Sequence, residues 1–499
     1  QLNKKIKNES NLKSFGIMVF AEIKKQRRIT LMDIVALLEE LVNGLIAAED
    51  KFFQNPKDFY SLERSVKSTT ESFSAAFLGN VLTSINEQIY KDGWRQGKYK
   101  VQRTDSRTLI SSVGDVTFES TYYRRYSDGT HHYLIEEILG LDPHERFTEE
   151  AEVVVLTEAL KTSYAEAAKT LPSKQEISKT TVMNKVHGIA EDIPLFVENK
   201  PKKQCEYLFI EADEDHVAEQ HGRWSKKEDN DGFISKLAYV YEYKRESPKC
   251  KARKELVDTF YFGGIYAGSK ENERFWNNVA DYIYANYDEG SLKRIYLLGD
   301  GGGWIKSGAK HLHKAVFCVD KYHMTKYINK AANQMLDEAD EAKSNIYRLI
   351  YKKDQKELIK YIDRMLASAN NQDPIEDLKT FVTGNWSAIM RTYHNKIITG
   401  CSAEGHVSHV LSDRLSSRPM AWSETGADRM SKLRCYERNY GREKIIDLVQ
   451  YSRERRKLEK TGTDNREEVH VPLRNVVFEH YDQSRSYIDR MQATSPYGT

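Results

Sequence analysis

Hydrophobic residues recur at helical spacing in three long stretches of the chain. From Met32 to about Tyr90, apolar residues return every three or four positions, which predicts two or three amphipathic helices of a packing or dimerisation module. The same period returns from Thr148 to Ile193 and from Tyr327 to about Ile398. The first residue is Gln1 rather than Met, and the helical period is clear only from Met32. We therefore expect residues 1–31 to be a non-native upstream extension.

Strand-like patterns fill two other parts of the chain. Residues 101–147 contain β-branched and aromatic runs with a turn at Ser127, which predicts a small antiparallel sheet. A charged linker with two prolines covers residues 194–204. From Glu206 to Val319 the pattern then predicts three strands, a helix, a strand, a helix and a strand. This order is typical of an RNase H-like α/β core, a mixed five-stranded sheet with flanking helices.

The patterns divide the chain into seven predicted segments. In chain order these are the possible extension (1–31), a helical N-terminal region (32–100), a small β-rich region (101–147), a helix-turn-helix domain (148–193), the first part of the RNase H-like core (205–325), an all-helical insertion (326–398) and the last part of the core with a C-terminal helical tail (399–499).

The helix-turn-helix prediction rests on two short helical patterns separated by Pro172. Helical hairpins that bind nothing are plentiful, so the pattern alone leaves both interpretations open. Beside a nuclease core, DNA reading is favoured, because such a domain places the start of its second helix against DNA. The residues predicted to contact DNA there are Ser178, Lys179, Thr180, Thr181 and Lys185.

Charge and cysteine content narrow the class of protein. Lys plus Arg (76) nearly cancels Asp plus Glu (74), so the net charge favours neither presence nor absence of a nucleic-acid partner. The charges are clustered, however: basic residues gather at Arg124 and Arg125, at 244–254 and at 453–457, and acids gather at 211–215. The five cysteines stand singly, which indicates neither a zinc ribbon nor a disulfide framework. No apolar run reaches the roughly 20 residues of a membrane helix, so we expect no membrane contact and a soluble, cytoplasmic, nucleoid-associated protein.

Three acidic residues are predicted to form a catalytic metal site. Asp213 ends the apolar run of the first core strand, and Asp300 follows the fourth strand. Glu404 falls in the first turn of a helix after the insertion, with Ser402 as the expected N-cap. Two divalent ions, roughly 4 Å apart, accelerate displacement at a phosphodiester, and Mg2+ prefers carboxylate oxygens. Any single Asp after a strand is commonly a loop cap, and Glu424 competes with Glu404 for the third position.

Other side chains near these acids are candidates for catalysis or DNA contact. His323 stands three residues after Asp320, where it could donate to a scissile phosphate or belong to a helix cap. Trp304 follows a glycine-rich stretch that lacks nucleotide-binding spacing, and it could stack on a base or belong to the core. Further candidates for phosphate contact are Arg124, Arg125, Lys306, His406, His409, Arg414 and Arg418, of which His406, His409 and Arg414 are expected on exposed helix faces.

Several of these motifs resemble one known family. The chain resembles the ISLre-type family of bacterial insertion-sequence transposases from about Met32 to its C-terminus, and the spacing from Asp320 to His323 is similar to a signature of Mutator-like transposases. The motifs that carry the resemblance lie at 109–118, 210–217, 299–306, 319–323 and 401–420. Ala421, where Gly is expected, and the third glycine after Asp300 depart from the pattern but touch no predicted ligand.

The resemblance implies a DDE transposase that recognises the inverted repeats of its own element. Such an enzyme frees 3'-OH ends and joins them to target DNA with two Mg2+ ions, for which we expect Mn2+ to substitute. The expected partners are double-stranded DNA and a second copy of the chain in a homo-oligomer, a dimer. Two alternatives stay open: an RNase H-like nuclease that cuts without joining, and a non-catalytic DNA-binding protein derived from a transposase.

Overall fold

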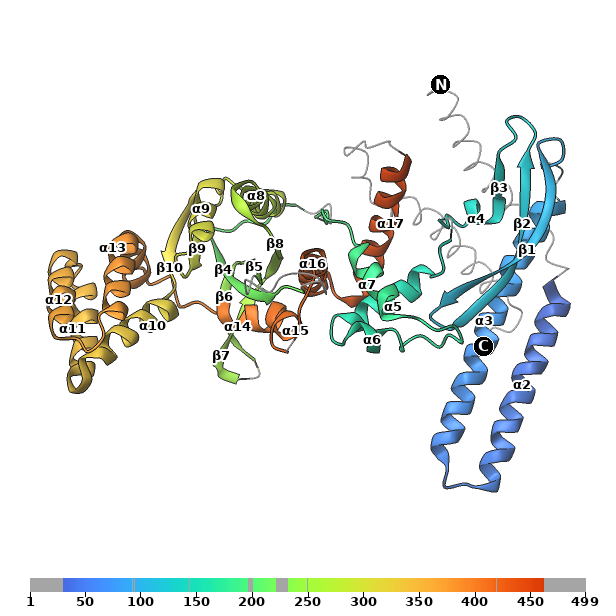
Figure 1. Cartoon of the computed structure of the whole chain (residues 1–499), viewed down its shortest axis with the longest axis horizontal. Coiled ribbons are helices and arrows are strands. Elements are labelled where there is room, and N and C mark those ends of the chain that lie inside the picture. Colours follow the sequence, from blue (N-terminus) through green and yellow to red (C-terminus); the bar gives the residue numbers. More distant parts are fainter. Residues whose placement is uncertain are drawn as a thin grey trace, which may run out of the picture.

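The computed structural model describes residues 30–461 except 92, 94, 143, 196–200, 221–231, 249 and 419. The molecule is elongated, with a helical hairpin and a small sheet at one end, a larger sheet in the middle and a group of helices at the other end (Figure 1). The predicted extension, residues 1–31, lies almost entirely outside the described residues. Within those residues, no helix has both the length and the apolar content to cross a lipid bilayer.

The N-terminal region is a long antiparallel helix pair packed on a three-stranded sheet. Gly44 of the first helix approaches Thr69 of the second so closely that a Cβ would lie 2.6 Å from the threonine methyl group. Asn86 donates to Thr121 at 3.0 Å and ties the second helix to the sheet. The elements are α2 (Thr30–Gln54), α3 (Phe59–Lys91), β1 (Tyr99–Ser111), β2 (Gly114–Arg125), β3 (His131–Tyr133) and α4 (Leu134–Ile138).

Three short helices follow, each with a hydroxyl side chain at its start. They are α5 (Glu149–Ala159), α6 (Tyr164–Ala167) and α7 (Lys179–His187), and their caps are Thr148, Ser163 and Ser178, which accept from backbone N–H groups three residues on. The C-terminal helix α17 (Ile445–Thr461) packs against α5, far from it in sequence.

The central sheet has five strands of mixed direction. In chain order they are β4 (Tyr207–Ala218), β5 (Gly232–Tyr241), β8 (Phe260–Ile265), β9 (Arg294–Gly299) and β10 (Ala315–Val319). Their spatial order is β10-β9-β4-β5-β8. β4, β5 and β8 pair antiparallel, whereas β9 and β10 run parallel to β4. The predicted succession of strands and helices in an α/β core is therefore present.

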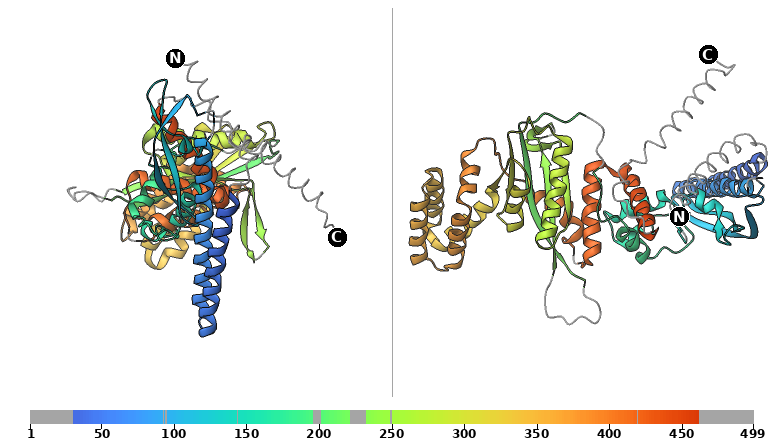
Figure 2. Two further views of the ribbon diagram at one scale, coloured as in Figure 1. Left: turned by 90° about the vertical axis from the view of Figure 1, so that its right-hand side faces the viewer. Right: turned by 90° about the horizontal axis from the view of Figure 1, so that it is seen from above.

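The two faces of this sheet are covered by different helices. Even-numbered residues of β4, such as Ile210, pack with α8 (Gly268–Asn286) and α9 (Gly303–His311). Odd-numbered residues, such as Phe209, pack with the helices that follow the insertion and with α5 to α7. Figure 2 shows helices on both sides of the strands. The alternation of β4 thus sends Asp213 to the second face and its neighbour Glu214 to the first.

A two-stranded ribbon was not among the predicted elements. It consists of β6 (Tyr243–Ser247) and β7 (Cys250–Val257), which pair antiparallel beside the main sheet. The basic residues 244–254 fall on this ribbon.

The predicted insertion consists of helices joined by short turns. Its helices are α10 (Lys321–Ala332), α11 (Ala339–Tyr351), α12 (Gln355–Ser368) and α13 (Asp373–His394), with a short 3-10 turn between α10 and α11. Two side chains of α13 attach it to the edge strand β10: Arg391 donates to the carbonyl of Phe317 at 2.8 Å, and Thr392 donates to that of Val319 at 2.7 Å. The insertion is therefore fixed beside the ends of β9 and β10.

After the insertion, the chain returns across the second face of the sheet. This segment contains α14 (Ala403–Val407), a π-helical turn (Ser408–Ser412) and α15 (Asp413–Leu415), and it is followed by α16 (Glu424–Tyr440). Val407, Val410, Leu411 and Leu415 are buried, as their spacing predicts.

Candidate active site

Three aspartates stand at the ends of neighbouring parallel strands. The register pairs Glu211 of β4 with Leu298 of β9, and Gly299 of β9 with Val319 of β10. Continuing that register brings Asp213, Asp300 and Asp320 to the same edge of the sheet. The backbone N–H of Asp320 donates to the carbonyl of Gly299 at 2.9 Å, which holds Asp320 beside the end of β9.

The charges of these residues influence one another. Burial raises the pKa of Asp213 to about 6, and the nearby carboxylate of Asp300 adds to the rise, although Glu214 N–H and His323 oppose it. Burial disfavours the protonated form of His323, yet the carboxylates of Asp320, Asp213 and Asp300 outweigh it and raise its pKa. Asp213, Asp300 and His323, all predicted as catalytic, are thus brought together.

Asp320 has two roles at the start of α10. Its carboxylate accepts from the N–H of Tyr322 at 2.7 Å as the N-cap, and its other oxygen lies 2.8 Å from Nδ1 of His323. The capping arrangement considered from the sequence is therefore present, and it also orients the imidazole. Asp320 is buried, so its negative charge lies beside the histidine and away from solvent.

The glycine loop after Asp300 packs against the helical insertion. Gly302 N–H donates to Asp300 at 2.7 Å, and Gly301 has a φ of +101°, which favours glycine. A Cβ at Gly301 would lie 3.4 Å from the amide oxygen of Asn385 on α13. This oxygen is buried and has no hydrogen-bond partner, although the amide nitrogen of Asn385 donates to Phe381. The insertion therefore supplies an unsatisfied acceptor beside the glycine loop that follows Asp300, which no sequence pattern indicates.

A buried glutamate fastens the segment that carries Glu404. Glu211 accepts from both the N–H (2.6 Å) and the hydroxyl (2.9 Å) of Ser402. It also accepts from the hydroxyls of Tyr239 and Tyr241 and pairs with Lys244 at 2.7 Å. The sequence predicts that the side chain of Ser402 caps α14, and this prediction is wrong. The hydroxyl of Ser402 donates to Glu211 instead.

Further along, Ser416 donates to Asp215 at 2.8 Å. Glu211 and Asp215 stand on either side of Asp213 on the same face of β4, so α14 and α15 cross the strand at the level of Asp213. The alternation 211, 213, 215 in a strand could have indicated this arrangement from the sequence.

Glu404 lies in the first turn of α14, as predicted, and its side chain is exposed. It accepts a hydrogen bond from the hydroxyl of Tyr322, which raises the pKa of that tyrosine. Across the described ranges of the chain, no three His, Cys, Asp or Glu side chains are grouped so as to hold a metal ion. Glu404 is thus near the start of α10, but it does not form a ready-made ligand set with Asp213 and Asp300. The competitor Glu424 begins α16 and is exposed.

The residues predicted for DNA contact on α7 differ in their surroundings. Ser178, Lys179 and Thr180 are exposed at the start of the helix, and Thr181 is half-buried. Lys185 instead pairs with Glu145 at 2.8 Å and with the buried Glu152 at 3.1 Å.

A member of the basic cluster 453–457 joins the same ion network. Arg453 is buried and pairs with Glu152 at 2.6 Å. The network therefore joins α5 and α7 to α17, and it occupies Lys185, for which the sequence predicts DNA contact, and Arg453 of the basic cluster.

Two residues of the α14–α15 segment are not on exposed faces, contrary to expectation. Arg414 is buried, donates to the carbonyl of Ala159 at 2.9 Å and lies over the ring of Trp422. It stands four residues after Val410 and three after Leu411, so it shares their buried face. His406 stacks on Tyr239 at 4.3 Å, and its Nδ1 lies 2.9 Å from the hydroxyl of Tyr261. His409 and Arg418 are exposed.

The remaining candidates lie in two places. Trp304 and Lys306 are half-buried on α9, and the indole N–H of Trp304 donates to Glu214 at 2.6 Å while its ring stacks on Trp276. Arg124 is exposed at the end of β2, and Arg125 donates to Asp128 at 3.1 Å and to the hydroxyl of Tyr99.

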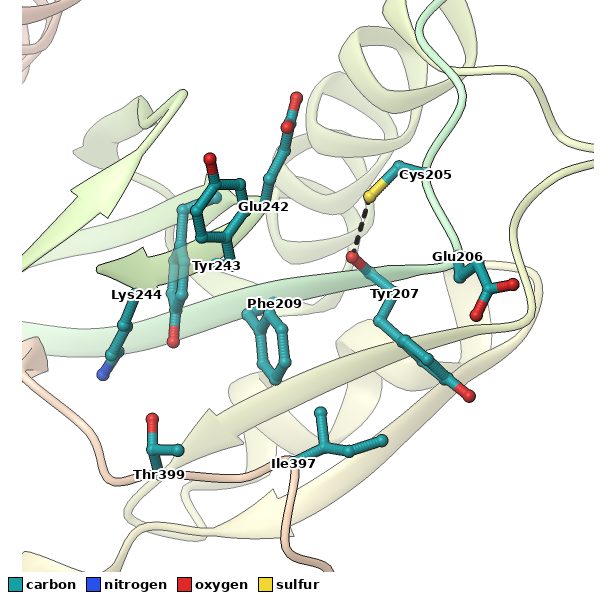
Figure 3. A pocket seen from close by; sticks show the side chains of 10 residues that line it. Cys205, Glu206, Tyr207, Phe209, Glu242, Tyr243, Lys244, Ile397 and Thr399 are labelled. Carbon is teal, nitrogen blue, oxygen red and sulfur yellow. Dashed lines mark hydrogen bonds between the residues drawn. The ribbon is translucent and has the colours of Figure 1, made fainter. Parts of the chain in front are cut away.

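In the part of the chain that the structure describes, two cavities near the central sheet have linings that do not include the three strand-end aspartates. One, of about 370 Å³, lies between α8 and α9 and includes Trp304. The other, of about 330 Å³, lies between the beginning of β4, the junction of β5 with β6 and residues 397–399, and its lining includes Tyr207, Tyr241 and Lys244 (Figure 3). In Figure 3 the thiol of Cys205 donates to the carbonyl of Tyr207. At about 3.3 Å per residue, Phe209 stands roughly 13 Å along β4 from Asp213.

Comparison with a solved structure gives a weak likeness. The Drosophila P element transposase strand transfer complex matches 64% of this chain and 82% of its own chain, at 11% sequence identity and a TM-score of 0.20. A match at this level establishes no relationship.

Comparison with curated proteins gives closer relatives, all from Caldanaerobacter subterraneus subsp. tengcongensis. Two UPF0236 proteins are each 33% identical over 379 residues, which are 75% of this chain and 77% or 73% of theirs. A third is 32% identical over 396 residues, 79% of this chain and 80% of its own, and its name joins eleven locus designations. The model of the uncharacterised protein family UPF0236 matches residues 53–450. The chain therefore belongs to the UPF0236 family.

Proposed function

We propose that this protein is a DDE transposase whose α/β core is RNase H-like. The observation that carries the proposal is the approach of Asp213 and Asp300 at the ends of adjacent parallel strands, with His323 beside them. The sheet supports it as well, since three antiparallel strands followed by two parallel ones, with the first strand central, is the order expected for such a core. Rigid strands of this kind hold carboxylates in fixed positions.

The donor chemistry fits a hard divalent cation. Asp213 and Asp300 offer carboxylate oxygens, the ligands that Mg2+ and Mn2+ prefer. Burial and mutual repulsion raise the pKa of Asp213 to about 6, and a bound cation would relieve both. Glu404 would complete the ligand set by turning from the Tyr322 hydroxyl, which its exposed position permits. When bound, two such ions supply the charge that stabilises the attacking and leaving oxygens at phosphorus.

The chain's own residues have distinct tasks in this proposal. Asp213 and Asp300 hold the reaction centre, and the contacts of Glu211 with Ser402 keep α14 across β4 so that Glu404 stays within reach. The imidazolium of His323, oriented by Asp320, donates to a nearby phosphate oxygen. Water is the first nucleophile and the freed 3'-OH is the second.

DNA contact is proposed for side chains that are accessible. Ser178, Lys179 and Thr180 stand exposed at the start of α7, where a helix presents N–H groups and short polar side chains to DNA. Arg124, His409 and Arg418 are exposed cationic or polar groups suited to phosphates.

The names of the relatives also support a mobile element. One of them joins eleven locus designations of a single strain, and another joins four. A product encoded at many places in one genome is expected when its gene moves or copies itself. We extend this property to the present chain as part of the proposal.

Metal-dependent cleavage of DNA tests the proposed function. The purified chain is incubated with Mn2+ or Mg2+ and a DNA fragment that carries the coding region with its flanking sequence. We expect nicking at the flanks and joining of the 3' ends to a second plasmid. Asp213→Asn and Asp300→Asn should each lower the rate at least about 100-fold, since each removes a metal ligand.

A matched pair of glutamates controls this experiment. Glu404→Gln should abolish cleavage, whereas Glu424→Gln, an equal change at an exposed helix start, should leave it within about twofold. Cleavage without joining would favour a nuclease, and binding without cleavage a non-catalytic DNA-binding protein. Either result, or cleavage that survives Asp213→Asn, contradicts the proposal.

A further inference from the structure

The first helix of the N-terminal hairpin has two apolar stripes. One contains Leu41, Gly44 and Ala48 and packs on α3. At 100° per residue, the second lies about a third of a turn further round α2 and faces solvent. Its members are between 43% and 66% exposed: Val35, Leu38, Val42, Ile46 and Phe53. A helix in a stable two-helix pair needs only one such stripe, so the second requires another explanation.

The second helix has a matching stripe on its outer side. Phe59, Val66 and Phe77 of α3 are 37% to 63% exposed, and they fall within a narrow arc of the helix. This arc is opposite the face on which Gly79 and Asn86 meet the small sheet. On each helix, the exposed stripe is reached from the face that contacts the other helix by turning in the same direction about the helix axis, the direction in which residue numbers increase. Because α2 and α3 are antiparallel, the two stripes lie on one face of the hairpin, here called the apolar hairpin face.

The size of this face suits association with another protein chain. Half of a large apolar residue exposes about 100 Å², so the eight members present on the order of 800 Å², the area that each partner contributes to a standard interface. Exposed apolar patches of this size are uncommon on proteins that remain monomeric. The hairpin also projects from the body of the molecule, which leaves the face accessible to a partner (Figure 2).

Charge restricts the class of partner. Helix α2 carries five acidic residues and a single lysine, which argues against a nucleic acid or an anionic membrane. A second copy of the same hairpin offers basic side chains, of which α2 has only one. Level with Glu49 near the tip, α3 carries Arg64 and Lys67, and Lys67 is largely exposed. A two-fold axis along the hairpin places each α2 over the partner's α3, so Glu49 lies level with Arg64 and Lys67 of the second copy. Glu63 and Glu71 stand beside these two cations, and Lys67 pairs with Glu71 at 3.8 Å, so the apolar area rather than the charge carries most of the association.

We propose that the apolar hairpin face pairs with the same face of a second copy of this chain. The product is a four-helix bundle in which Val42 and Ile46 are buried at the centre. The proposal is independent of the catalytic function, since none of its residues lies near the strand-end aspartates.

The mass of the chain in solution tests this pairing. We expect the full chain to be dimeric by sedimentation velocity or light scattering at about 10 μM. Val42→Glu combined with Ile46→Glu should weaken association at least about 100-fold, because it places charges in the apolar centre. The matched control is Ala36→Glu with Ala47→Glu, which adds the same charges to exposed positions of α2 outside the stripe. This control should stay dimeric, and far-ultraviolet circular dichroism should show equal helicity in all three proteins.

The arrangement of helices has its own test. Arg64→Glu with Lys67→Glu should weaken the dimer about tenfold at low salt and less at high salt, since the loss is electrostatic. A dimer unaffected by these changes overturns the placement of α2 over α3. A chain that is monomeric at 50 μM overturns the pairing altogether. So does a monomer that dimerises only after removal of residues 1–29, because the occupant of the face would then be that segment.

Discussion

At the scale of single residues, two acids on one face of β4 have opposite surroundings. Glu211 is fully buried, yet it accepts from Ser402, two tyrosines and Lys244, and these partners lower its pKa against the effect of burial. Asp213, two residues on, accepts from one backbone N–H and faces Asp300, and its pKa rises. The difference separates a structural carboxylate from the one proposed to bind a metal ion.

Asn385 provides a test at this scale. Asn385→Asp adds a negative charge beside Gly301, so we expect a lower melting temperature without divalent ions and a larger rise on adding Mn2+ than in the unchanged chain. Differential scanning fluorimetry measures both. The control is Asn371→Asp, an exposed position before α13, which should change neither value. An equal Mn2+ response in Asn385→Asp and the unchanged chain would place this side chain outside the proposed metal site.

At the scale of elements, the sequence predicts most of the central sheet and little of the ribbon. Long apolar runs specify β4 and β9 because their residues are buried by helices. The sequence does not predict the ribbon β6–β7, because lysine, arginine and glutamate dominate it and no alternating apolar face marks it as a strand pair. Ser402 shows another limit. A serine before a helix predicts a cap, but a partner 191 residues away takes its hydroxyl, and no local pattern contains that information.

The ion network between α5, α7 and α17 yields a prediction about stability. Lys185→Met leaves buried Glu152 with Arg453 as its remaining partner and should cost about 3 kcal/mol of unfolding free energy at pH 7. Burial opposes the ionised form of Glu145, but Lys185 and Arg453 lower its pKa below the ordinary 4.5. A depressed pKa stabilises the folded state above pH 4.5, and that stabilisation disappears on acidification.

The loss of unfolding free energy caused by Lys185→Met should therefore be smaller at pH 4 than at pH 7, as measured by urea unfolding. Lys293→Met is the matched control, because Lys293 pairs with Glu206 while both side chains are about 60% exposed. That change should cost less than about 1 kcal/mol at either pH. A deficit of Lys185→Met as small as the control's would mean that the network contributes little.

At the scale of the whole molecule, distant parts of the sequence complete one another. The acids of the candidate site come from two strands before the helical insertion and from α14 after it, and the insertion itself contributes Asn385. Likewise, α5 to α7 are closed by α17, nearly 300 residues later, through Arg453 and the hydroxyl of Ser452, which accepts from Ala190 N–H. The sequence indicates α5, α7 and α17 as helices but not that they pack together, because no local pattern in one segment identifies the distant segment that it contacts.

Truncation tests this long-range closure. A chain that ends at Lys444 lacks α17 and leaves Glu152 without Arg453, so residues 148–193 should lose protection in amide hydrogen exchange at least about 100-fold. The strands β4 and β9 should keep more of theirs, because α17 packs chiefly against α5 and α16, although its Ile445, Leu448 and Val449 belong to the same hydrophobic cluster as one face of these strands. The control chain ends at Thr461 and retains α17. Unchanged protection of α5 and α7 in the shorter chain would show that these helices fold alone.

The late position of Arg453 also bears on synthesis. A ribosome makes the strands and the acids well before it reaches α17, so the helices proposed to read DNA gain their last supporting partner only near the end of translation. A premature stop codon after α16 would therefore leave a product with its acids assembled but its proposed reader unfinished. If the proposed function holds, such a fragment competes poorly with the complete protein for DNA.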